Sequence, residues 1–455
     1  MDAEQWCERI PALTEDVHRD RRAVERYATA VEEHLDSLPS PERRTPEHRA
    51  HARQVRRACD GLRARFLALH AERVHSELAD GAGPAGGRGH RPGLEGLADA
   101  AGGAFPGLLP DRDRLDAEQR LALADKEGLD VALGVFFQAL LRSRPGGSRL
   151  MERLLRPTPR ARDLLSGFRC EGRADLGAVS VERRDGAGYL TVHQPQSLNA
   201  DNNGFVAAME TAVDQVLLDE GVRVGVLRGG RMVHPRYAGR RVFSSGINLK
   251  DLYHGRISYL SFFLRRELGF VHKLMRGLVV ANEAAWPGEV VTKPWLAVVD
   301  SFAIGGGAQL LFLFDYVLAG ADSYVSLPAA QEGIVPGGAN LRLGGRGDSR
   351  LARQLLLGGR RIRAGEDTAR TFFDEVVEPD RLDAAAERAL ARLDDHAVPA
   401  NRHLLHLAEE PPHAFQDYMA EYALHQALRV HSPDVVERLA RFMERPRPAQ
   451  SAVPR

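Results

Sequence analysis

The chain has 455 residues, enough for two to four domains that each bury a sizeable core. Hydrophobic residues make up 44% of it and charged residues 27%, which excludes a disordered, collagen-like or coiled-coil chain. The 62 Lys and Arg residues balance the 62 Asp and Glu residues, so no net positive charge attracts nucleic acid or an anionic membrane. We therefore expect neither as a partner.

The cysteines and the first residues indicate the compartment. Cys7, Cys59 and Cys170 are far apart and form no C-x-x-C pair, which predicts reduced thiols. The start, MDAEQWCERIPALTEDVHRD, has no basic segment followed by an apolar one, and no stretch reaches about 18 apolar residues. The sequence therefore predicts a cytoplasmic protein.

Residues 1–170 are predicted to form a helical domain. Apolar residues in 24–38 recur at steps of three and four, the period of one helix face. The pair Thr45-Pro46 then provides an N-cap and a first helical position for the next helix. Gly, Pro and Ala are dense in 80–110, so we expect an irregular linker there, and helical periodicity resumes over 115–141.

Residues 171–380 are predicted to form an α/β domain. Asp185-Gly186 separates two strand-like segments and supplies the positive φ angles of a two-residue hairpin turn. Short strands then alternate with helices, which favours parallel strands joined by crossover helices. The expected strands are 223–229, 295–300, 316–320 and 324–328, with helices over 252–280 and after Gly307. Residues 381–455 are predicted to be helical up to Met443, with a frayed tail from Pro446.

Two glycine-rich turns each follow a predicted strand and precede a helix: VFSSGINL at 242–249 and AIGGGAQL at 303–310. Backbone N–H groups at a helix start lack partners in the chain, so they can bind an oxyanion, and glycine lets a substrate approach closely. Together the turns form a candidate oxyanion hole. Taken singly, either turn is equally compatible with close packing of a helix on a strand. A dinucleotide fingerprint fits poorly, because Leu310 stands where its third glycine belongs.

The turns occur together with SLNADN, KPWLAVVD and FDYVLAGADSYVSLPAAQEGIVPG. In this order and spacing, the segments resemble the crotonase (enoyl-CoA hydratase/isomerase) superfamily over 178–379. The resemblance implies a crotonase-like ββα spiral core, an acyl-CoA thioester as substrate, and C-terminal helices over 381–455 that form trimers. We therefore expect a homotrimer or a dimer of trimers. The helices after Asp383 carry the leucines Leu390, Leu393, Leu404, Leu405 and Leu407.

The resemblance also implies the roles of the turn residues. The N–H groups of Ile247 and Gly306 would polarise the thioester carbonyl and stabilise the enolate oxygen that forms when a proton leaves the adjacent carbon. Gly246 and Gly305 precede them and are expected to contact the substrate. Lys250 and Lys273 are candidates for the CoA phosphates, with solvated side chains as the alternative.

Two departures from the hydratase pattern are informative. A hydratase carries acid/base glutamates where this chain has Gln309 and Ala329. Neither side chain exchanges a proton near neutral pH, so addition of water by paired carboxylates is disfavoured. Gln309 is predicted instead to hydrogen-bond a substrate hydroxyl, and an amide satisfied within the core is the alternative.

Arg266 and Asp201 are predicted as further substrate contacts. Arg266 shares a helix row with Phe262 and Phe270. Asp201 follows Leu198-Asn199-Ala200, a segment that lines the acyl pocket in the superfamily. A surface ion pair is the alternative for each of the two.

Within the superfamily, three features resemble the dioxygenases that convert (3,5-dihydroxyphenyl)acetyl-CoA and O2 to 3,5-dihydroxyphenylglyoxylate and CoA in glycopeptide-antibiotic biosynthesis: the helical N-terminal extension, the turn variants SSGINL and IGGGAQL, and the missing glutamates. This resemblance implies that O2 is a co-substrate and that neither metal nor organic cofactor takes part. No H-E-x-x-H motif occurs in the chain. Thioester hydrolysis, double-bond isomerisation and non-catalytic acyl-CoA binding remain open as alternatives.

Overall fold

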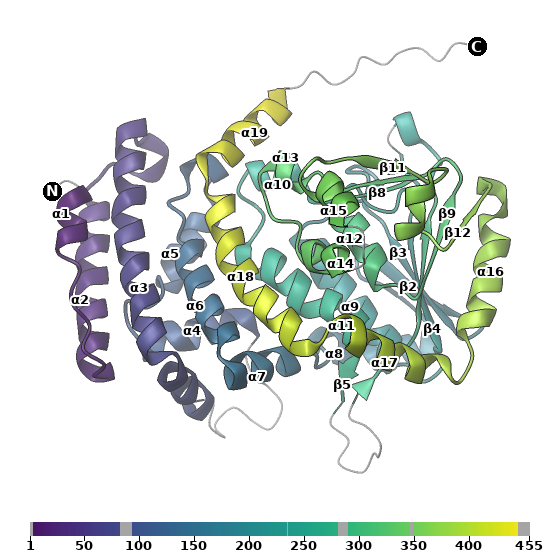
Figure 1. Ribbon diagram of the computed structural model, residues 1–455, viewed down its shortest axis with the longest axis horizontal. Coiled ribbons are helices and arrows are strands. Elements are labelled where there is room, and N and C mark those ends of the chain that lie inside the picture. The colour runs from purple at the N-terminus through teal and green to yellow at the C-terminus, as the bar shows by residue number, and fades with distance from the viewer. Residues whose placement is uncertain (1–2, 82–92, 234, 281–289, 346–348, 445–455) are drawn as a thin grey trace.

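The computed structural model describes residues 3–81, 93–233, 235–280, 290–345 and 349–444. Helices α1 to α7 lie on one side of the molecule and the main sheet lies on the other, with helix α18 (Pro412–Val430) between them, whereas α8 (Pro159–Glu171) lies on the side of the sheet (Figure 1). None of the described helices has the length and apolar character needed to cross a membrane.

The chain before the first strand is helical, as predicted. Its helices are α1 (Ala3–Glu8), α2 (Val17–Asp36), α3 (Pro46–Gly81), α4 (Leu94–Ala104), α5 (Arg112–Gln119), α6 (Asp130–Arg142), α7 (Arg144–Leu154) and α8 (Pro159–Glu171). The predicted cap of α3 is present, since the N–H of His48 donates to Oγ1 of Thr45 at 3.3 Å. Helix α2 begins earlier than predicted, because Asp16 accepts from the N–H groups of His18 and Arg19.

The irregular linker predicted over 80–110 is wrong in part. Helix α3 continues to Gly81, and α4 occupies Leu94–Ala104, while residues 82–92 lie outside the described part of the chain. One face of α4 is buried, and it consists of Leu94, Leu97, Ala98 and Ala101. This face has the helical period, which the surrounding glycines concealed in the sequence.

The main sheet has seven strands in the order β1-β2-β3-β4-β7-β9-β12. Their bounds are β1 (Arg173–Asp175), β2 (Val179–Arg184), β3 (Ala187–Val192), β4 (Val224–Gly229), β7 (Trp295–Val299), β9 (Tyr316–Gly320) and β12 (Glu375–Val377). The predicted hairpin joins β2 to β3, and its turn residues Asp185 and Gly186 have φ angles of 50° and 81°. From β3 to β12 neighbouring strands are parallel, as predicted for an α/β domain.

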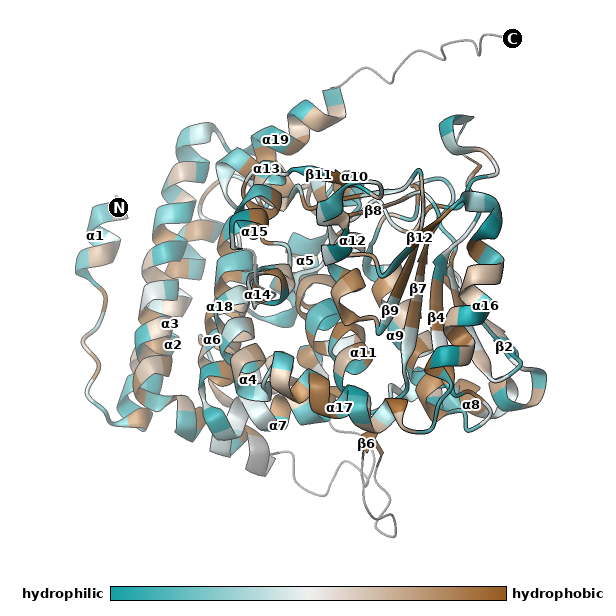
Figure 2. Cartoon of the chain, turned by 45° about the vertical axis from the view of Figure 1, so that its right-hand side comes forward, coloured by the Kyte–Doolittle hydropathy of each residue, from teal (hydrophilic) through white to brown (hydrophobic). Residues whose placement is uncertain are grey.

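Helices cover both faces of this sheet, which explains its continuous apolar strands. All five residues of β7 are buried. Helix α9 (Asn203–Leu218) packs on one face, where Val216 lies against Gly188. Helix α16 (Leu382–Leu393) packs on the other face, where Ala385 and Ala389 meet apolar residues of β4 and β7. Figure 2 shows these brown strands between the helices.

The single helix predicted over 252–280 is wrong. The segment contains α10 (Leu249–Tyr253), two π-helical stretches (Tyr259–Leu264 and Glu267–Val271), α11 (His272–Arg276) and β5 (Leu278–Val279), which pairs with β6 (Val290–Val291). Glycines cause the breaks. Gly255 follows α10 at φ 71°, Gly269 is non-helical at φ −94° and ψ −111°, and Gly277 ends α11 at φ 83°.

A smaller sheet, in the order β11-β10-β8, lies beside the second glycine-rich turn. Its strands are β8 (Phe302–Ile304), β10 (Tyr324–Ser326) and β11 (Arg361–Arg363). Short helices follow these strands and reach toward the same region. They are α12 (Gly306–Leu310), α13 (Ala329–Glu332), α14 (Ala339–Gly345) and α15 (Ser349–Leu356).

The C-terminal part is helical, as predicted, with α17 (Val398–Glu409), α18 (Pro412–Val430) and α19 (Pro433–Glu444) after α16. Helix α18 packs along α6, and a Cβ added at Gly134 would lie 2.8 Å from the Cβ of Ala427. One apolar core extends from the N-terminal helices through the sheet to α19. The division of the chain at residues 170 and 380 stays a prediction, and the tail predicted from Pro446 lies outside the described residues.

Candidate active site

The two glycine-rich turns lie against each other. Ser244 and Ala303 form a parallel bridge, and the N–H of Ile304 donates to the Ser244 carbonyl at 3.0 Å. Gly246 and Gly305 have φ angles of 83° and 53°, and a Cβ added at Gly305 would lie 3.5 Å from the Cα of Gly246. Glycine therefore provides both the conformation and the close approach.

Two N–H groups are left free where the turns meet. Ile247 and Gly306 line one cavity, and within the described residues their N–H groups make no hydrogen bond. Gly306 is the first residue of α12, so its N–H has no acceptor in the preceding turn of helix. The neighbouring N–H groups are occupied, since Gly246 donates to Ser244 Oγ at 3.0 Å and Gly305 to the Ser326 carbonyl at 2.9 Å. The pair can bind an oxyanion.

Strained backbone brings Asp201 to these turns. Leu198 and Asn199 both have a φ of 54°, a left-handed conformation that costs an ordinary residue on the order of 1 kcal/mol. The Asn199 side chain stabilises it by donating to the Val242 carbonyl at 2.7 Å and accepting from the N–H of Gln194 at 2.8 Å. Asp201 then forms a parallel bridge with Ile247.

Arg266 hydrogen-bonds to the other two side chains predicted as substrate contacts, Asp201 and Gln309, in one network. Its guanidinium donates to Asp201 Oδ2 at 3.4 Å, to Gln309 Oε1 at 2.8 Å and to the Gly306 carbonyl at 2.9 Å. Arg266 is 4% exposed and Asp201 1% exposed, so the alternative of a surface ion pair is wrong for both. The network lies directly behind the two free N–H groups, and its residues line the same cavity.

Glu267 completes the network and was not predicted. Its Oε1 accepts from Arg266 at 2.6 Å, and its Oε2 accepts from Gln309 Nε2 at 2.6 Å and from the N–H of Gly338 at 3.0 Å. Both ends of the Gln309 amide are therefore bonded within the protein, as the alternative interpretation of this residue expected. One N–H of its NH2 group and a lone pair of its oxygen remain for a ligand.

Burial and neighbouring charges shift the pKa values of the ionisable groups in this cavity. It raises the pKa of Asp201 to about 6, although Arg266 and Ser244 favour the carboxylate. Burial acts to lower the pKa of Arg266, but the carboxylates of Glu267 and Asp201 outweigh it and raise that pKa. Burial also raises the pKa of Tyr422 well above its ordinary value, so this phenol stays neutral.

Three of the cavity-lining residues that were not predicted are ionisable: Glu267, Glu332 and Tyr422. Arg266 and Glu267 are adjacent in the chain, and both line the cavity at the point where the second π-helical stretch begins. The spacing between Glu332 and Ala329 contains a signal, since residues three apart share a helix face. Tyr422 belongs to α18, far along the chain, and no local pattern marks it.

The two candidate lysines differ. Lys250 is exposed. Lys273 is fully buried and pairs with Asp214 at 2.8 Å and with Glu210 at 2.9 Å, so the prediction that it meets CoA phosphates is wrong. Its ion pairs join α11 to α9 instead.

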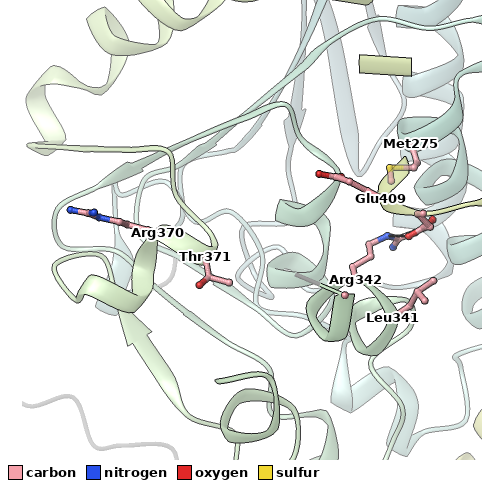
Figure 3. Close-up of a pocket in the computed structure, with 8 residues that line it drawn as sticks. Met275, Leu341, Arg342, Arg370, Thr371 and Glu409 are labelled. Atoms are coloured by element: carbon pink, nitrogen blue, oxygen red, sulfur yellow. Dashed lines mark hydrogen bonds and ion pairs between the residues drawn. The ribbon is translucent and has the colours of Figure 1, made fainter. Parts of the chain in front are cut away.

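A larger cavity of about 540 Å³ lies between α11, α14 and the end of α17 (Figure 3). Arg342 in its wall pairs with the buried Glu410 at 2.9 Å, so that cation is already neutralised. Arg370 points away from Arg342 in Figure 3. None of the predicted site residues lines this cavity. No group of three or more His, Cys, Asp or Glu side chains is placed to hold a metal in the part of the chain that the structure describes.

The model of the family Enoyl-CoA hydratase/isomerase matches residues 182–449, so the chain belongs to this family and the resemblance seen in its motifs is confirmed. The (3,5-dihydroxyphenyl)acetyl-CoA 1,2-dioxygenase of Amycolatopsis orientalis is 49% identical over 432 residues, which cover 95% of this chain and 98% of the relative. A probable enoyl-CoA hydratase of Rhizobium meliloti is 29% identical and covers 48% of this chain and 76% of its own length.

The enoyl-CoA hydratase of Mycobacterium avium subsp. paratuberculosis, a solved structure, is 22% identical and covers 59% of this chain and 99% of its own, with a TM-score of 0.48. The family match begins at residue 182, after the N-terminal helices. The match with the Amycolatopsis orientalis relative covers 95% of the chain, so it includes most of those helices.

Proposed function

We propose that this chain is a dioxygenase that converts (3,5-dihydroxyphenyl)acetyl-CoA and O2 to 3,5-dihydroxyphenylglyoxylate and CoA. The observation that carries the proposal is the 49% identity to a dioxygenase of this substrate over 95% of the chain. Membership of the enoyl-CoA hydratase/isomerase family supports an acyl-CoA thioester as substrate. The site supplies the chemistry in three ways.

First, the N–H groups of Ile247 and Gly306 receive the thioester oxygen. When a proton leaves the α-carbon, negative charge develops on that oxygen, and two preorganised donors in a buried site stabilise it. Gly246 and Gly305 hold the two turns close together, since a Cβ at Gly246 would lie 3.1 Å from the Ile304 carbonyl oxygen.

Second, the enolate itself reduces O2. An enolate conjugated to a dihydroxyphenyl ring is electron-rich, so it passes an electron to O2 and combines with the resulting superoxide to give a peroxide at the α-carbon. The peroxide oxygen attacks the thioester carbonyl and expels CoA as its thiolate. Cleavage of the O–O bond with loss of the second α-hydrogen as a proton leaves the keto acid, so all atoms of O2 enter the product. No metal or organic cofactor enters this scheme.

Third, Asp201, Arg266 and Gln309 hold the ring. Asp201 and Arg266 have buried polar atoms at the cavity wall, and Gln309 keeps one donor for a hydroxyl. The absence of acid/base glutamates at 309 and 329 supports oxidation over hydration. We further propose that the enzyme is cytoplasmic and works as a homotrimer or a dimer of trimers.

Oxygen-electrode traces with the arylacetyl-CoA test the proposal. We expect uptake of one O2 for each CoA released, with the thiol measured by a chromogenic disulfide. Release of CoA without O2 uptake would instead identify a thioester hydrolase, and binding without turnover would identify an acyl-CoA-binding protein. Either result would overturn the proposal.

A further inference from the structure

The proposed reaction needs a base for the α-proton, and the cavity contains few ionisable side chains. Those among its described lining residues are Asp201, Arg266, Glu267, Glu332 and Tyr422. A base must have an unoccupied lone pair and an environment that lets it gain a proton. These two requirements can be applied to each side chain.

Four of the five are unsuitable. Arg266 is a cation, and Tyr422 holds its proton because burial raises its pKa. Both oxygens of Glu267 already accept hydrogen bonds, from Arg266 and from Gln309 with Gly338. Asp201 accepts from Ser244 at 3.1 Å and pairs with Arg266.

Glu332 differs from the others in that its carboxylate makes no hydrogen bond and no ion pair with the described residues. It is the last residue of α13, and Ala329 is the first. The two lie three residues apart on one helix face, and both line the cavity that also holds the free N–H groups of Ile247 and Gly306.

The backbone around Glu332 is held firmly. Gly333 ends α13 at φ 90°, and its carbonyl accepts from Arg429 Nε at 2.7 Å. The Gln331 carbonyl accepts from Arg438 Nη1 at 2.7 Å. Both arginines also pair with Asp434, so they hold the backbone of α13 against α18 and α19.

We propose that the carboxylate of Glu332 is the base that removes the α-proton of the acyl-CoA thioester. A lone pair of the carboxylate forms the O–H bond, and the C–H electron pair moves into the enolate, whose oxygen is held by Ile247 and Gly306. Glu332 later gives this proton to the thiolate, which is released as CoA, and the carboxylate is restored. This inference rests on the proposed function and assigns its first step to one side chain.

The electrostatic setting agrees with this role. Burial raises the pKa of Glu332 to about 7, which suits a base that works near neutral pH. The charged groups that line the same cavity are Arg266, Asp201 and Glu267, and those that contact the backbone beside Glu332 are Arg429 from α18 and Arg438 from α19, which both pair with Asp434. Each of these cations is paired with a carboxylate.

The test measures exchange of the α-hydrogens into deuterated water by NMR, without O2, so that enolate formation is separated from oxidation. We expect wild-type exchange to rise with pH through about 7 and then level off, because the carboxylate is the active form. Glu332→Gln keeps the size of the side chain and removes the base, and it should slow exchange by roughly 100- to 10,000-fold and abolish the rise with pH. Glu437→Gln makes the same chemical change on the exposed face of α19 and should leave exchange unchanged.

Two results would overturn the inference: exchange in Glu332→Gln within about threefold of wild type, or an unchanged pH profile. If Glu332→Gln does not fold, Glu332→Ala with added formate provides the same test, since formate should restore exchange only where a carboxylate is missing. Failure of the proposed function looks different. In that case the wild type itself takes up no O2 with the arylacetyl-CoA, whether or not its α-hydrogens exchange.

Discussion

The guanidinium of Arg266 donates to Oε1 of Gln309 at 2.8 Å, and this bond sets the direction of the amide. Because the oxygen faces the cation, Nε2 faces Glu267 and donates to its Oε2 at 2.6 Å. A glutamate at position 309 would place a second carboxylate against the first. The choice of an amide at this position is therefore dictated by Glu267 as well as by any substrate hydroxyl.

Gln309→Glu should strongly reduce O2 uptake and should destabilise the protein in a pH-dependent manner. Two carboxylates at this distance share one proton, so the folded-state pKa of one is raised above its unfolded value. The folded state then holds a proton that the unfolded chain releases near pH 4.3, and stability is lost as pH rises through the folded pKa. Urea unfolding should show a deficit of about 1–3 kcal/mol that is larger at pH 8 than at pH 5.

Gln309→Asn is the matched control for charge. It keeps the amide but shortens its reach, and loss of a buried hydrogen bond of about 1–3 kcal/mol corresponds to a roughly 5- to 150-fold loss in rate or affinity. Its stability deficit should not depend on pH. A pH-independent deficit in Gln309→Glu as well would contradict the pairing argued above.

Substitution of Gly306 separates the effect of its N–H from that of its missing side chain. A Cβ at this position would lie 2.8 Å from Arg266 Nη2 and 2.9 Å from Asp201 Oδ2, so both Gly306→Ala and Gly306→Pro disturb the network. Only proline removes the N–H, and a helix tolerates proline near its first position. We expect α-hydrogen exchange in Gly306→Pro to be slower than in Gly306→Ala by about 100- to 1,000-fold. Equal rates in the two variants would exclude the N–H as an oxyanion donor.

The sequence predicted the turns of this site because their signals are local. A strand, one to three glycines and a helix occur within about ten residues, and Gly246 and Gly305 indeed face each other. Asp201 and Arg266 were predicted from their segments alone, and the structure brings both to Gly306. Their roles toward a substrate stay proposals.

Other features depend on geometry that composition does not encode. Glu267 lines the cavity at the start of a π-helical stretch, and a standard helical period does not predict that stretch. Tyr422 lies on α18, which packs along α6 although the two helices are far apart in the sequence, so no local pattern predicts its position. Lysine is typical of a protein surface, yet Lys273 is buried, because Glu210 and Asp214 pair with its charge.

Asp201→Asn should change the pH dependence of stability. Burial raises the pKa of Asp201 to about 6 in the folded state, so the folded wild type binds a proton more tightly than the unfolded chain does. Its stability therefore falls as pH rises from about 4 to about 6, by up to about 3 kcal/mol from this group. Asparagine has no such dependence. Thermal unfolding of both proteins between pH 4 and 7 should show that the stability of the variant rises relative to that of wild type as pH rises. If the two stabilities change with pH in parallel, the raised pKa of Asp201 is contradicted.

Exhaustive chelation should leave O2 uptake at its full rate. The proposed chemistry takes its electrons from the enolate, and the described residues contain no group of three or more potential metal-ligating side chains at one place. Elemental analysis should find neither iron nor copper in stoichiometric amount. If activity disappears with the chelator and returns with one particular metal, the cofactor-free reaction is wrong.

Helix α17 should carry the subunit contact. Five leucines were expected at this contact. On α16, Leu393 is buried and Leu390 is partly buried against the sheet. On α17, Leu404, Leu405 and Leu407 are 65%, 55% and 36% exposed. Burial of a leucine side chain contributes about 1.5–3 kcal/mol, so two adjacent exposed leucines are a sizeable contribution to a subunit interface.

Light scattering at micromolar concentration should give three or six times the chain mass of 50.1 kDa. The double variant Leu404→Asp/Leu405→Asp should shift the protein toward the monomer, because association would then bury two unpaired carboxylates. Leu69→Asp, at a 49% exposed leucine on α3, makes the same chemical change far from α17 and should leave the mass unchanged. A monomeric wild type would contradict the expected assembly, and an unchanged mass in the double variant would place the subunit contact on another surface.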